Sequence, residues 1–310
     1  MKNIFISTSS FDLSNFDETD LNTLRGAGVS IRTNPVGRKL TEDEAIENLR
    51  DDVIGLIAGL EPLNSRVLDA APRLKAIARV GIGLDTVDLA AAKARGIEVF
   101  NTPEPPAQAV AELTIGHILG MLRNISRVDR AIRAGDWKGQ FGQLLSGKTV
   151  GIVGFGRIGR KVAELLAPFG VDVVAHDPIA PNVSGVRFVD LSTLLTTSDV
   201  VTLHVPYTTD NHHMIAAEQI ASMKQGSFLV NIARGGLVDE DALRSSLVSG
   251  HLAGAALDCF ETEPYSGPLK DLDSVVMTAH MGTYATETRG QMEREAAARL
   301  INHLSKIGEI

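Results

Sequence analysis

The sequence contains one cysteine and no excess of positive charge, and both shortages restrict what the protein can do. Cys259 cannot form a disulfide within the chain and has no cysteine neighbours for a metal cluster, so we expect a reducing compartment and a packing role for this thiol. The 30 Lys and Arg residues are outnumbered by 38 Asp and Glu residues, which gives a formal charge of −8. This balance argues against binding to nucleic acid or to an anionic membrane, and an anionic ligand would need locally placed cations.

Long hydrophobic runs are also missing. The apolar run within Met1–Ser7 is too short for a secretion signal. The longest mostly apolar stretch is Leu113–Leu122, which contains Gly116 and His117 and is shorter than the roughly 20 residues of a membrane-spanning helix. We therefore predict a cytoplasmic protein with no membrane partner.

A chain of 310 residues exceeds the size at which one hydrophobic core usually stops growing, so we predict two domains. Short β-rich runs alternate with helical runs from Ile4 to Phe100 and again from Lys148 to about His280, a pattern typical of a parallel sheet with crossover helices. The proline-dense segment 101–106 between them predicts a hinge. The predicted fold class is α/β with a doubly wound parallel sheet.

Two longer helical patterns lie outside this alternation. Apolar residues recur at helical spacing through 107–134, which predicts one long helix and an oligomer contact. A second pattern, Glu287–Leu304, predicts a closing helix. Its predicted apolar face consists of Ala296, Ala297, Leu300 and Leu304.

A glycine motif follows the strand predicted at Thr149–Val153. Gly154 permits a tight turn, Gly156 lets the backbone approach a pyrophosphate, and Gly159 allows a helix to pack closely on the strand. The N-terminus of that helix then directs its positive end at the phosphates. Strand, glycine turn and helix in this order predict a dinucleotide-binding Rossmann unit.

An acidic residue stands at the end of the next predicted strand. Asp177 lies eighteen residues beyond Gly159, where a carboxylate accepts hydrogen bonds from the adenosine ribose hydroxyls. The same carboxylate would repel a 2′-phosphate, although Arg157 and His176 are also present nearby in the sequence. We predict NAD as the cofactor, with NADP less favoured.

Three polar residues follow later predicted strands, at the edge where a doubly wound sheet binds its ligands. Arg234 offers a planar fork suited to a carboxylate, and His280 has a side chain that titrates near neutrality and can act as acid and base. A neighbouring Glu263 carboxylate would favour the imidazolium form of the histidine. Considered singly, each is more often a loop charge, a surface acid or a strand-end histidine.

In combination behind the glycine motif, Arg234, Glu263 and His280 resemble the D-isomer-specific 2-hydroxyacid dehydrogenase family, and the resemblance extends over nearly the whole chain. It implies an NAD-dependent oxidoreductase that moves a hydride reversibly between NAD(H) and a small 2-hydroxy or 2-keto acid. By this resemblance Arg234 holds the substrate, Glu263 supports the histidine, and His280 contacts the substrate and exchanges a proton with it.

The resemblance also implies how the domains are divided. A flavodoxin-like substrate domain would comprise residues 1–100 and 283–310, and an NAD-binding Rossmann domain would comprise residues 101–282. The family's cofactor-lining positions correspond to Gly154, Gly156, Arg157, Ile158, Gly159, Asp177, His204, Pro206, Ala233, Asp258 and Gly282.

Two further segments look like family features. Arg79–Asp85 is similar to the substrate loop, whose backbone amides bind the substrate carboxylate, and Ala109–Glu112 is similar to the signature of the dimer helix. We therefore expect a homodimer formed through the region 107–134. The implied substrate-binding loop residues are Val80, Gly81, Ile82 and Gly83.

Within the family, Gly59–Leu63 and Asn101–Pro103 look most like the phosphoglycerate dehydrogenase-like branch, so 3-phosphoglycerate is one candidate among several 2-hydroxy acids. Ala279 stands where a proline usually precedes the histidine of the family. The chain ends about thirty residues after His280, so we expect no regulatory domain and no serine feedback.

Several alternatives compete with this interpretation. A formate dehydrogenase of the same superfamily pairs its histidine with a glutamine, which Glu263 argues against, whereas phosphite oxidation uses a similar set of residues. A non-catalytic NAD-sensing corepressor is disfavoured by the complete Arg, Glu and His set. His212–His213 invites a metal interpretation, but no carboxylate or histidine stands at helical ligand spacing, so we predict a solvated loop and no metal.

Overall fold

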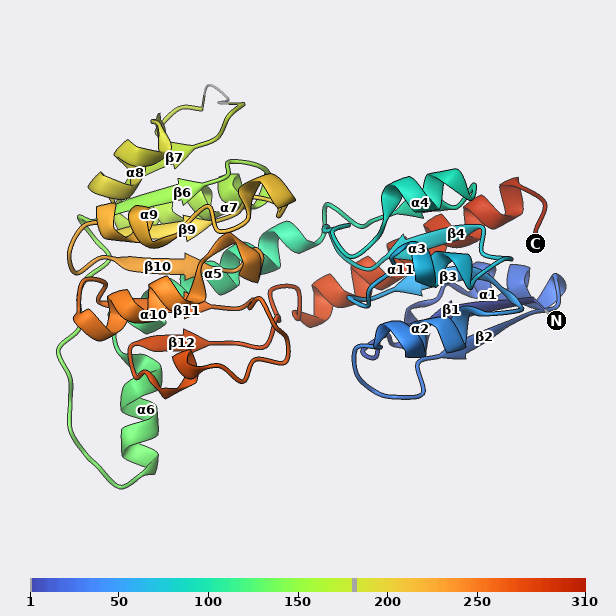
Figure 1. Cartoon of the computed structure of the whole chain (residues 1–310), viewed down its shortest axis with the longest axis horizontal. Coiled ribbons are helices and arrows are strands. Elements are labelled where there is room, and N and C mark those ends of the chain that lie inside the picture. Colours follow the sequence, from blue (N-terminus) through green and yellow to red (C-terminus); the bar gives the residue numbers. More distant parts are fainter. Residues whose placement is uncertain (1, 180–182) are drawn as a thin grey trace. The chain divides into compact units, whose positions relative to one another are not determined.

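The structure, a computed structural model, describes residues 2–179 and 183–310 and divides into two compact units (Figure 1). Unit 1 consists of Met1–Pro106 and Thr283–Ile310, and unit 2 consists of Ala107–Gly282. Each unit has hydrophobic cores of its own on the two faces of a parallel sheet. None of the helices in the described residues is both long enough and apolar enough to span a membrane.

Unit 1 is built on a five-stranded parallel sheet with the order β2-β1-β3-β4-β5. This is the order of flavodoxin-like sheets, which confirms that part of the predicted fold. Helices α1 and α11 pack on one face and α2, α3 and α4 on the other, so the central strand β3 is buried along its whole length. The strands are β1 (Lys2–Ile6), β2 (Val29–Thr33), β3 (Val53–Ala58), β4 (Ala76–Arg79) and β5 (Glu98–Phe100). The helices are α1 (Glu18–Gly26), α2 (Glu42–Leu49), α3 (Ser65–Asp69), α4 (Leu89–Ala94) and α11 (Thr286–Lys306).

The predicted closing helix is α11, and its predicted apolar face is confirmed. Its apolar side packs on the strands of unit 1, although the helix is separated from them in the sequence by the whole of unit 2. The residues Ala296, Ala297, Leu300 and Leu304 are all at most 1% exposed.

Unit 2 is built on a seven-stranded parallel sheet with the order β12-β11-β10-β9-β6-β7-β8. The strand order reverses at β6, which lies between β9 and β7, and this confirms the predicted Rossmann-type sheet. Helices α5 and α7 pack on one face and α8, α9 and α10 on the other. The strands are β6 (Thr149–Val153), β7 (Asp172–His176), β8 (Arg187–Phe188), β9 (Val200–Leu203), β10 (Phe228–Asn231), β11 (Gly254–Leu257) and β12 (Val275–Met277).

The helices of unit 2 vary in length and in burial. The N-terminal pair contains the hydrophobic α5 and the exposed α6, in which no residue is buried. The helices are α5 (Pro106–Leu122), α6 (Ile125–Arg133), α7 (Arg157–Leu166), α8 (Leu191–Thr197), α9 (Ala217–Ser222) and α10 (Glu240–Ser249). The 3₁₀ turns of the chain are η1 (Leu13–Asn15), η2 (Ala167–Phe169), η3 (Thr209–Asn211), η4 (Gly235–Leu237) and η5 (Pro268–Asp271).

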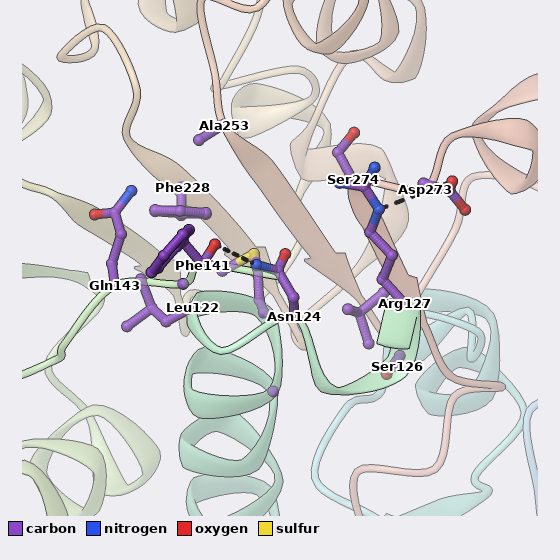
Figure 2. A pocket seen from close by; sticks show the side chains of 14 residues that line it. Leu122, Asn124, Ser126, Arg127, Phe141, Gln143, Phe228, Ala253, Asp273 and Ser274 are labelled. Carbon is purple, nitrogen blue, oxygen red and sulfur yellow. Dashed lines mark hydrogen bonds and ion pairs between the residues drawn. The ribbon is translucent and has the colours of Figure 1, made fainter. Parts of the chain in front are cut away.

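The prediction of one continuous helix over 107–134 is wrong, because the helical segment breaks between α5 and α6. Asn124 adopts a left-handed backbone conformation with φ of 55°, which interrupts the helix and which asparagine tolerates better than most residues. Its side-chain Nδ2 donates to the carbonyl of Phe141 at 3.0 Å, a contact that Figure 2 shows. Apolar periodicity continues across the break, so the pattern alone did not reveal it.

The proline-dense segment 101–106 belongs to unit 1, whereas the sequence placed it at the start of the second domain. Its contacts explain this assignment. Asn101 Nδ2 donates to the carbonyl of Ile82 at 2.8 Å, and Thr102 Oγ1 accepts the backbone N–H of Gly81 at 2.9 Å. The segment is thus hydrogen-bonded to the loop that follows β4.

Candidate active site

The carboxyl edge of the unit 2 sheet brings two of the predicted residues into direct contact. His280, which follows β12, places Nδ1 at 2.9 Å from Oε2 and 3.1 Å from Oε1 of Glu263, which follows β11. Both side chains are 24% exposed, so solvent or a ligand can reach them. Because the carboxylate accepts a hydrogen bond from Nδ1, the arrangement leaves Nε2 of His280 as the atom that can exchange a proton with a ligand.

The backbone holds this pair in place from both sides. His280 has a φ of 52°, an uncommon left-handed conformation for a side chain of this size, and its N–H donates to the carbonyl of Asp258 at 2.7 Å. On the other side, the N–H of Phe260 donates to Oε1 of Glu263 at 3.1 Å. Strained backbone of this kind persists where surrounding contacts over-determine it, and it is typical of functional sites.

Arg234 lies in the loop after β10, the neighbour of β11 in the sheet. Because β10, β11 and β12 are parallel neighbours, the loops with Arg234, Glu263 and His280 emerge at one edge. The buried side chain of Asn231, which the sequence analysis did not single out, shapes the arginine loop. Its Nδ2 donates to the carbonyl of Arg234 at 2.8 Å, and its Oδ1 accepts the N–H of Ala233 at 3.1 Å.

The arginine loop is packed tightly against the glutamate loop. A Cβ at Gly235 would lie 1.9 Å from the carbonyl carbon of Phe260, so a side chain at this position would collide with backbone. Arg234 itself donates from Nη1 to the carbonyl of Ala233 at 2.7 Å. The loops that contain Arg234 and Glu263 are therefore positioned together.

The glycine motif between β6 and α7 has the geometry that a bound pyrophosphate requires. Gly154 has a φ of 92°, and a Cβ there would lie 2.7 Å from the carbonyl carbon of His204. A Cβ at Gly159 would lie 2.1 Å from the carbonyl oxygen of Gly154, which shows how closely the helix approaches the strand. Gly156 is the N-cap of α7 and has open space where a Cβ would be, so its backbone is accessible to phosphate.

Asp177, immediately after β7, contacts the same glycine loop. Its Oδ2 accepts the N–H of Phe155 at 2.7 Å and its Oδ1 accepts the N–H of Ile179 at 2.9 Å. The carboxylate is thereby fixed beside the turn that would hold a dinucleotide. Arg157 and Ile158 are the first two residues of α7, and Ile158 packs into the core beneath the loop.

The loop after β9 contributes a neutral histidine. Burial lowers the pKa of His204 to about 3, and its Nε2 lies 3.0 Å from Thr202 Oγ1. Its Nδ1 is buried without a hydrogen-bond partner among the described residues, so this atom can accept or donate a hydrogen bond to a bound group. Pro206 follows in the same loop, where its carbonyl accepts Nδ2 of Asn211 at 2.8 Å.

Asp258 is the centre of a buried network that the sequence analysis found only in part. The carboxylate, 1% exposed, accepts Thr278 Oγ1 at 2.5 Å and the N–H groups of Met281 and Gly282 at 2.9 and 2.8 Å. His117 Nε2 lies 3.0 Å from Thr278 Oγ1, and burial lowers the pKa of His117 while the charge of Asp258 opposes the shift. Because His117 and Thr278 lie 161 residues apart, no local pattern relates them.

The predicted substrate loop follows β4 in unit 1. Gly81 has a φ of 149°, and its N–H is donated to Thr102 Oγ1 at 2.9 Å and to the carbonyl of Arg79 at 3.0 Å. The residues Val80, Ile82 and Gly83 belong to the same turn.

A pocket of about 230 Å³ lies at the opposite, amino-terminal edge of the unit 2 sheet, away from the candidate active site (Figure 2). It is bordered by the start of β10 at Phe228, by the residues before β11 and β12, and by the segment around Phe141. In Figure 2, Arg127 points toward Asp273, with which it forms an ion pair at 4.0 Å. The predicted catalytic residues do not line this pocket.

Three features together define a nicotinamide-nucleotide-dependent dehydrogenase. They are the Rossmann sheet, the open glycine turn with an acid beside it, and the carboxylate–imidazole pair at the same sheet edge. Residues 115–282 match the family model for the D-isomer specific 2-hydroxyacid dehydrogenase, NAD binding domain. The chain belongs to the D-isomer specific 2-hydroxyacid dehydrogenase family, which confirms the resemblance seen in the sequence.

Known relatives support this assignment over most of the chain. The chain is 39% identical to a hydroxypyruvate reductase of Thermotoga maritima, covering 86% of this chain and 89% of that protein. It is also 39% identical to a D-3-phosphoglycerate dehydrogenase of Methanocaldococcus jannaschii, covering 82% of this chain and 50% of that protein. Among solved structures, D-lactate dehydrogenase from Aquifex aeolicus complexed with NAD and lactic acid superimposes with a TM-score of 0.80 at 27% identity, covering 98% of this chain and 96% of that one.

These findings confirm the predicted cofactor, NAD, and the predicted enzyme class, an oxidoreductase. The protein is an NAD-binding oxidoreductase that acts on the CH–OH group of 2-hydroxy acids. The open turn at Gly156, the carboxylate of Asp177 and the buried Nδ1 of His204 fit such a cofactor.

Proposed function

We propose that the protein catalyses reversible hydride transfer between NAD(H) and a small D-2-hydroxy acid, with Arg234, Glu263 and His280 as the catalytic set. The observation that supports this proposal most directly is the 2.9 Å contact between Glu263 and His280 at the carboxyl edge of the nucleotide-binding sheet. A histidine fixed by a carboxylate through Nδ1 is the arrangement that general acid–base catalysis requires. The remaining cofactor-lining roles, at Ala233, Pro206, Asp258 and Gly282, belong to the same proposal.

Each side chain would then have one task. Bound nicotinamide supplies or accepts the hydride. His280 donates a proton from Nε2 to the carbonyl oxygen of a 2-keto acid, or removes it from the hydroxyl in the reverse direction. Glu263 holds the imidazole through its contact with Nδ1, and Arg234 binds the substrate carboxylate through its planar guanidinium. The loop with Val80, Gly81, Ile82 and Gly83, in unit 1, is proposed as a substrate-binding loop.

The substrate is proposed to be a short 2-keto acid or its D-2-hydroxy acid, with 3-phosphoglycerate among the candidates. Relatives with equal identity of 39% are a hydroxypyruvate reductase and a D-3-phosphoglycerate dehydrogenase, so overall similarity favours neither substrate. The deciding experiment measures NADH absorbance with glyoxylate, pyruvate, hydroxypyruvate, 2-oxoglutarate and 3-phosphohydroxypyruvate, with phosphite and formate tested with NAD.

The expected result is turnover with at least one keto acid, together with loss of that turnover in His280→Ala. Turnover confined to phosphite or formate would replace the proposed substrate class. No turnover with any member of the panel, while NADH still binds, would favour a non-catalytic NAD-sensing protein instead.

The single cysteine, Cys259, is buried, which fits the cytoplasm as the site of this activity.

We also propose that the protein is a homodimer formed through the region around α6. Large hydrophobic side chains are exposed there, and Trp137 alone is 88% exposed. An apolar surface of this kind is typical of an interface, and a second copy of the chain is the proposed occupant. The exposed residues are Ile125, Ile132, Trp137, Phe141 and Leu144.

Sedimentation velocity tests the dimer. The wild type should sediment at twice the chain mass, and a double variant with Trp137→Ser and Phe141→Ser should sediment as a monomer. Val248→Ser, which removes another exposed hydrophobic side chain on α10, is the control and should remain dimeric. A monomeric wild type at micromolar concentration would overturn the proposal.

A further inference from the structure

A second group of ligand-type side chains lies outside the candidate active site. His212 and His213, directly after η3, and Glu261 each offer one ligand atom, and the three atoms lie within 4.8 Å of one another. Nε2 of His213 is hydrogen-bonded to Glu261. The imidazole rings of His212 and His213 stack with centroids 3.8 Å apart and planes 24° apart. All three residues belong to unit 2, so their mutual placement does not depend on the other unit.

The backbone holds these side chains together. The N–H of His213 donates to the carbonyl of Gly236 at 2.8 Å, and His213 has a φ of 52°. The N–H of Glu261 donates to Oε1 of Glu240 at 2.9 Å. Tyr207 OH lies 3.3 Å from Nδ1 of His212, which orients that ring. Two loops that are distant in the sequence are thus fixed so that their ligand atoms converge.

The prediction that His212 and His213 lie in a solvated loop was based only on the lack of ligands at helical spacing. Glu261 lies 48 residues away from His213, so no local pattern indicates this third ligand. Glu240 adds a second carboxylate beside the group, because its Oε1 accepts the N–H of Glu261.

We propose that His212, His213 and Glu261 form a binding site for a divalent late-transition-metal cation, with Zn²⁺ as its representative. Two imidazoles and one carboxylate are a ligand set that zinc takes in proteins, with a fourth position left for water. Mg²⁺ and Ca²⁺ prefer sites made of oxygen ligands, so the two histidines select against them.

A cation bound at this site would cross-link two loops of unit 2. One loop contains His212 and His213 and is bonded to Gly236, two residues after Arg234. The other contains Glu261, two residues before Glu263. A cation bound to both loops stabilises the folded state, because the unfolded chain does not bring these ligands together.

In the experiment, the untagged, chelator-treated full-length protein is titrated with Zn²⁺. Calorimetry measures binding, and thermal unfolding measures Tm. We expect one saturable site with a micromolar Kd and a rise in Tm of roughly 5 °C or more when free Zn²⁺ is about 100 times the Kd. Mg²⁺ at the same concentration should leave Tm unchanged. Neither readout depends on catalytic activity.

Two variants test the assignment of the ligands. His213→Asn removes the imidazole but keeps a residue that tolerates positive φ, and Glu261→Gln keeps the side-chain shape while removing the charge. Each should weaken Zn²⁺ binding by at least tenfold and abolish most of the Tm rise. The matched controls are His251→Asn, at the turn before β11, and Glu218→Gln, on the exposed side of α9, and both should bind as the wild type does.

Two outcomes would overturn the proposal. One is the absence of saturable binding below about 1 mM Zn²⁺. The other is binding that survives in His213→Asn and Glu261→Gln but is lost in Cys259→Ala. That second result would locate the cation at Cys259, Glu263 and His280, whose ligand atoms also lie within 4.8 Å of one another.

Discussion

The two units present the carboxyl edges of similar parallel sheets in different ways. In unit 2, the turn after β6 has open space at Gly156, and ionisable side chains follow β11 and β12. In unit 1, the turn after β4 is filled, because a Cβ at Gly81 would lie 1.7 Å from Nη1 of Arg79. The N–H of Gly81 is also already donated to Thr102. Unit 2 therefore offers both space for a nucleotide and titratable groups, whereas unit 1 offers a rigid turn of backbone.

The comparison shows that glycine serves opposite purposes in the two turns. Gly156 leaves its surroundings open for a ligand, whereas Gly81 makes room for the protein's own buried guanidinium. Both turns are glycine-rich and both follow a short buried strand. Only the contacts distinguish the open turn at Gly156 from the filled turn at Gly81.

The largest expected effect is a loss of turnover when the proposed proton donor at the carboxyl edge of unit 2 is removed. His280→Ala should lower kcat by about 100-fold or more, because general acid catalysis commonly contributes that much. NADH binding, measured by fluorescence titration, should stay near that of the wild type. His251→Ala is a matched control that removes an imidazole elsewhere in unit 2. Near-normal turnover of His280→Ala would remove this residue from the proposed mechanism.

A methyl group in the filled turn should destabilise the protein without touching the nucleotide site. Gly81→Ala introduces a Cβ at a φ of 149° and against the Arg79 guanidinium, so we expect a loss of about 1–3 kcal/mol in the free energy of unfolding. Gly156→Ala is the matched comparison. It should cost little stability, since its φ is −74° and its surroundings are open, but it should weaken NAD binding. Urea unfolding and NADH titration of both variants check this, and equal stability losses would contradict the contrast.

Removal of the acid beside the open turn should alter cofactor choice. Asp177→Ala should weaken NAD binding about tenfold, or about 1.4 kcal/mol, because hydrogen bonds to a charged group are lost. It should also reduce the preference for NAD over NADP, since the charge that repels a 2′-phosphate is gone. Asp172→Ala, at the other end of β7, is the control. Unchanged Kd values for both cofactors would exclude Asp177 from the site.

The last expected effect appears only at acidic pH and concerns the buried histidine after β9. Burial lowers its pKa from the ordinary histidine value of 6.5 to about 3, so His204 is neutral in the fold while the unfolded chain takes up a proton below pH 6.5. Stability therefore falls as the pH drops from about 6.5 toward 3, by up to about 1.4 kcal/mol per pH unit from this group. His204→Gln should make the slope of unfolding free energy between pH 6 and pH 4 shallower by that amount. Identical slopes in wild type and variant would show that the ring is protonated in the folded state.

Features encoded within a short stretch of sequence could be predicted well. The strand, the glycine turn and the helix from Thr149 to Leu166 are contiguous, so their order was enough to predict the nucleotide-binding unit. Asp177 follows one strand later and lies beside that turn, as the spacing indicated. The apolar face of α11 was predicted because a helix repeats its buried positions every three to four residues.

Features that depend on distant contacts could not be predicted in the same way. The pair Glu263 and His280 came from a family resemblance, because nothing in either residue's neighbourhood indicates the other. The bond between His117 and Thr278 spans 161 residues and leaves no periodic signal. The break at Asn124 was missed because hydrophobic periodicity records which side of a helix is apolar and does not record the backbone angles of one residue.

The close packing of Gly235 against the backbone of Phe260 limits which substitutions could change the substrate of this enzyme. Since no side chain fits between these two loops, the guanidinium and the carboxylate cannot be moved apart by small insertions or substitutions there. Under the proposed mechanism, new substrates would be accommodated by altering residues elsewhere in the binding region, while the loops of Arg234 and Glu263 stay packed together.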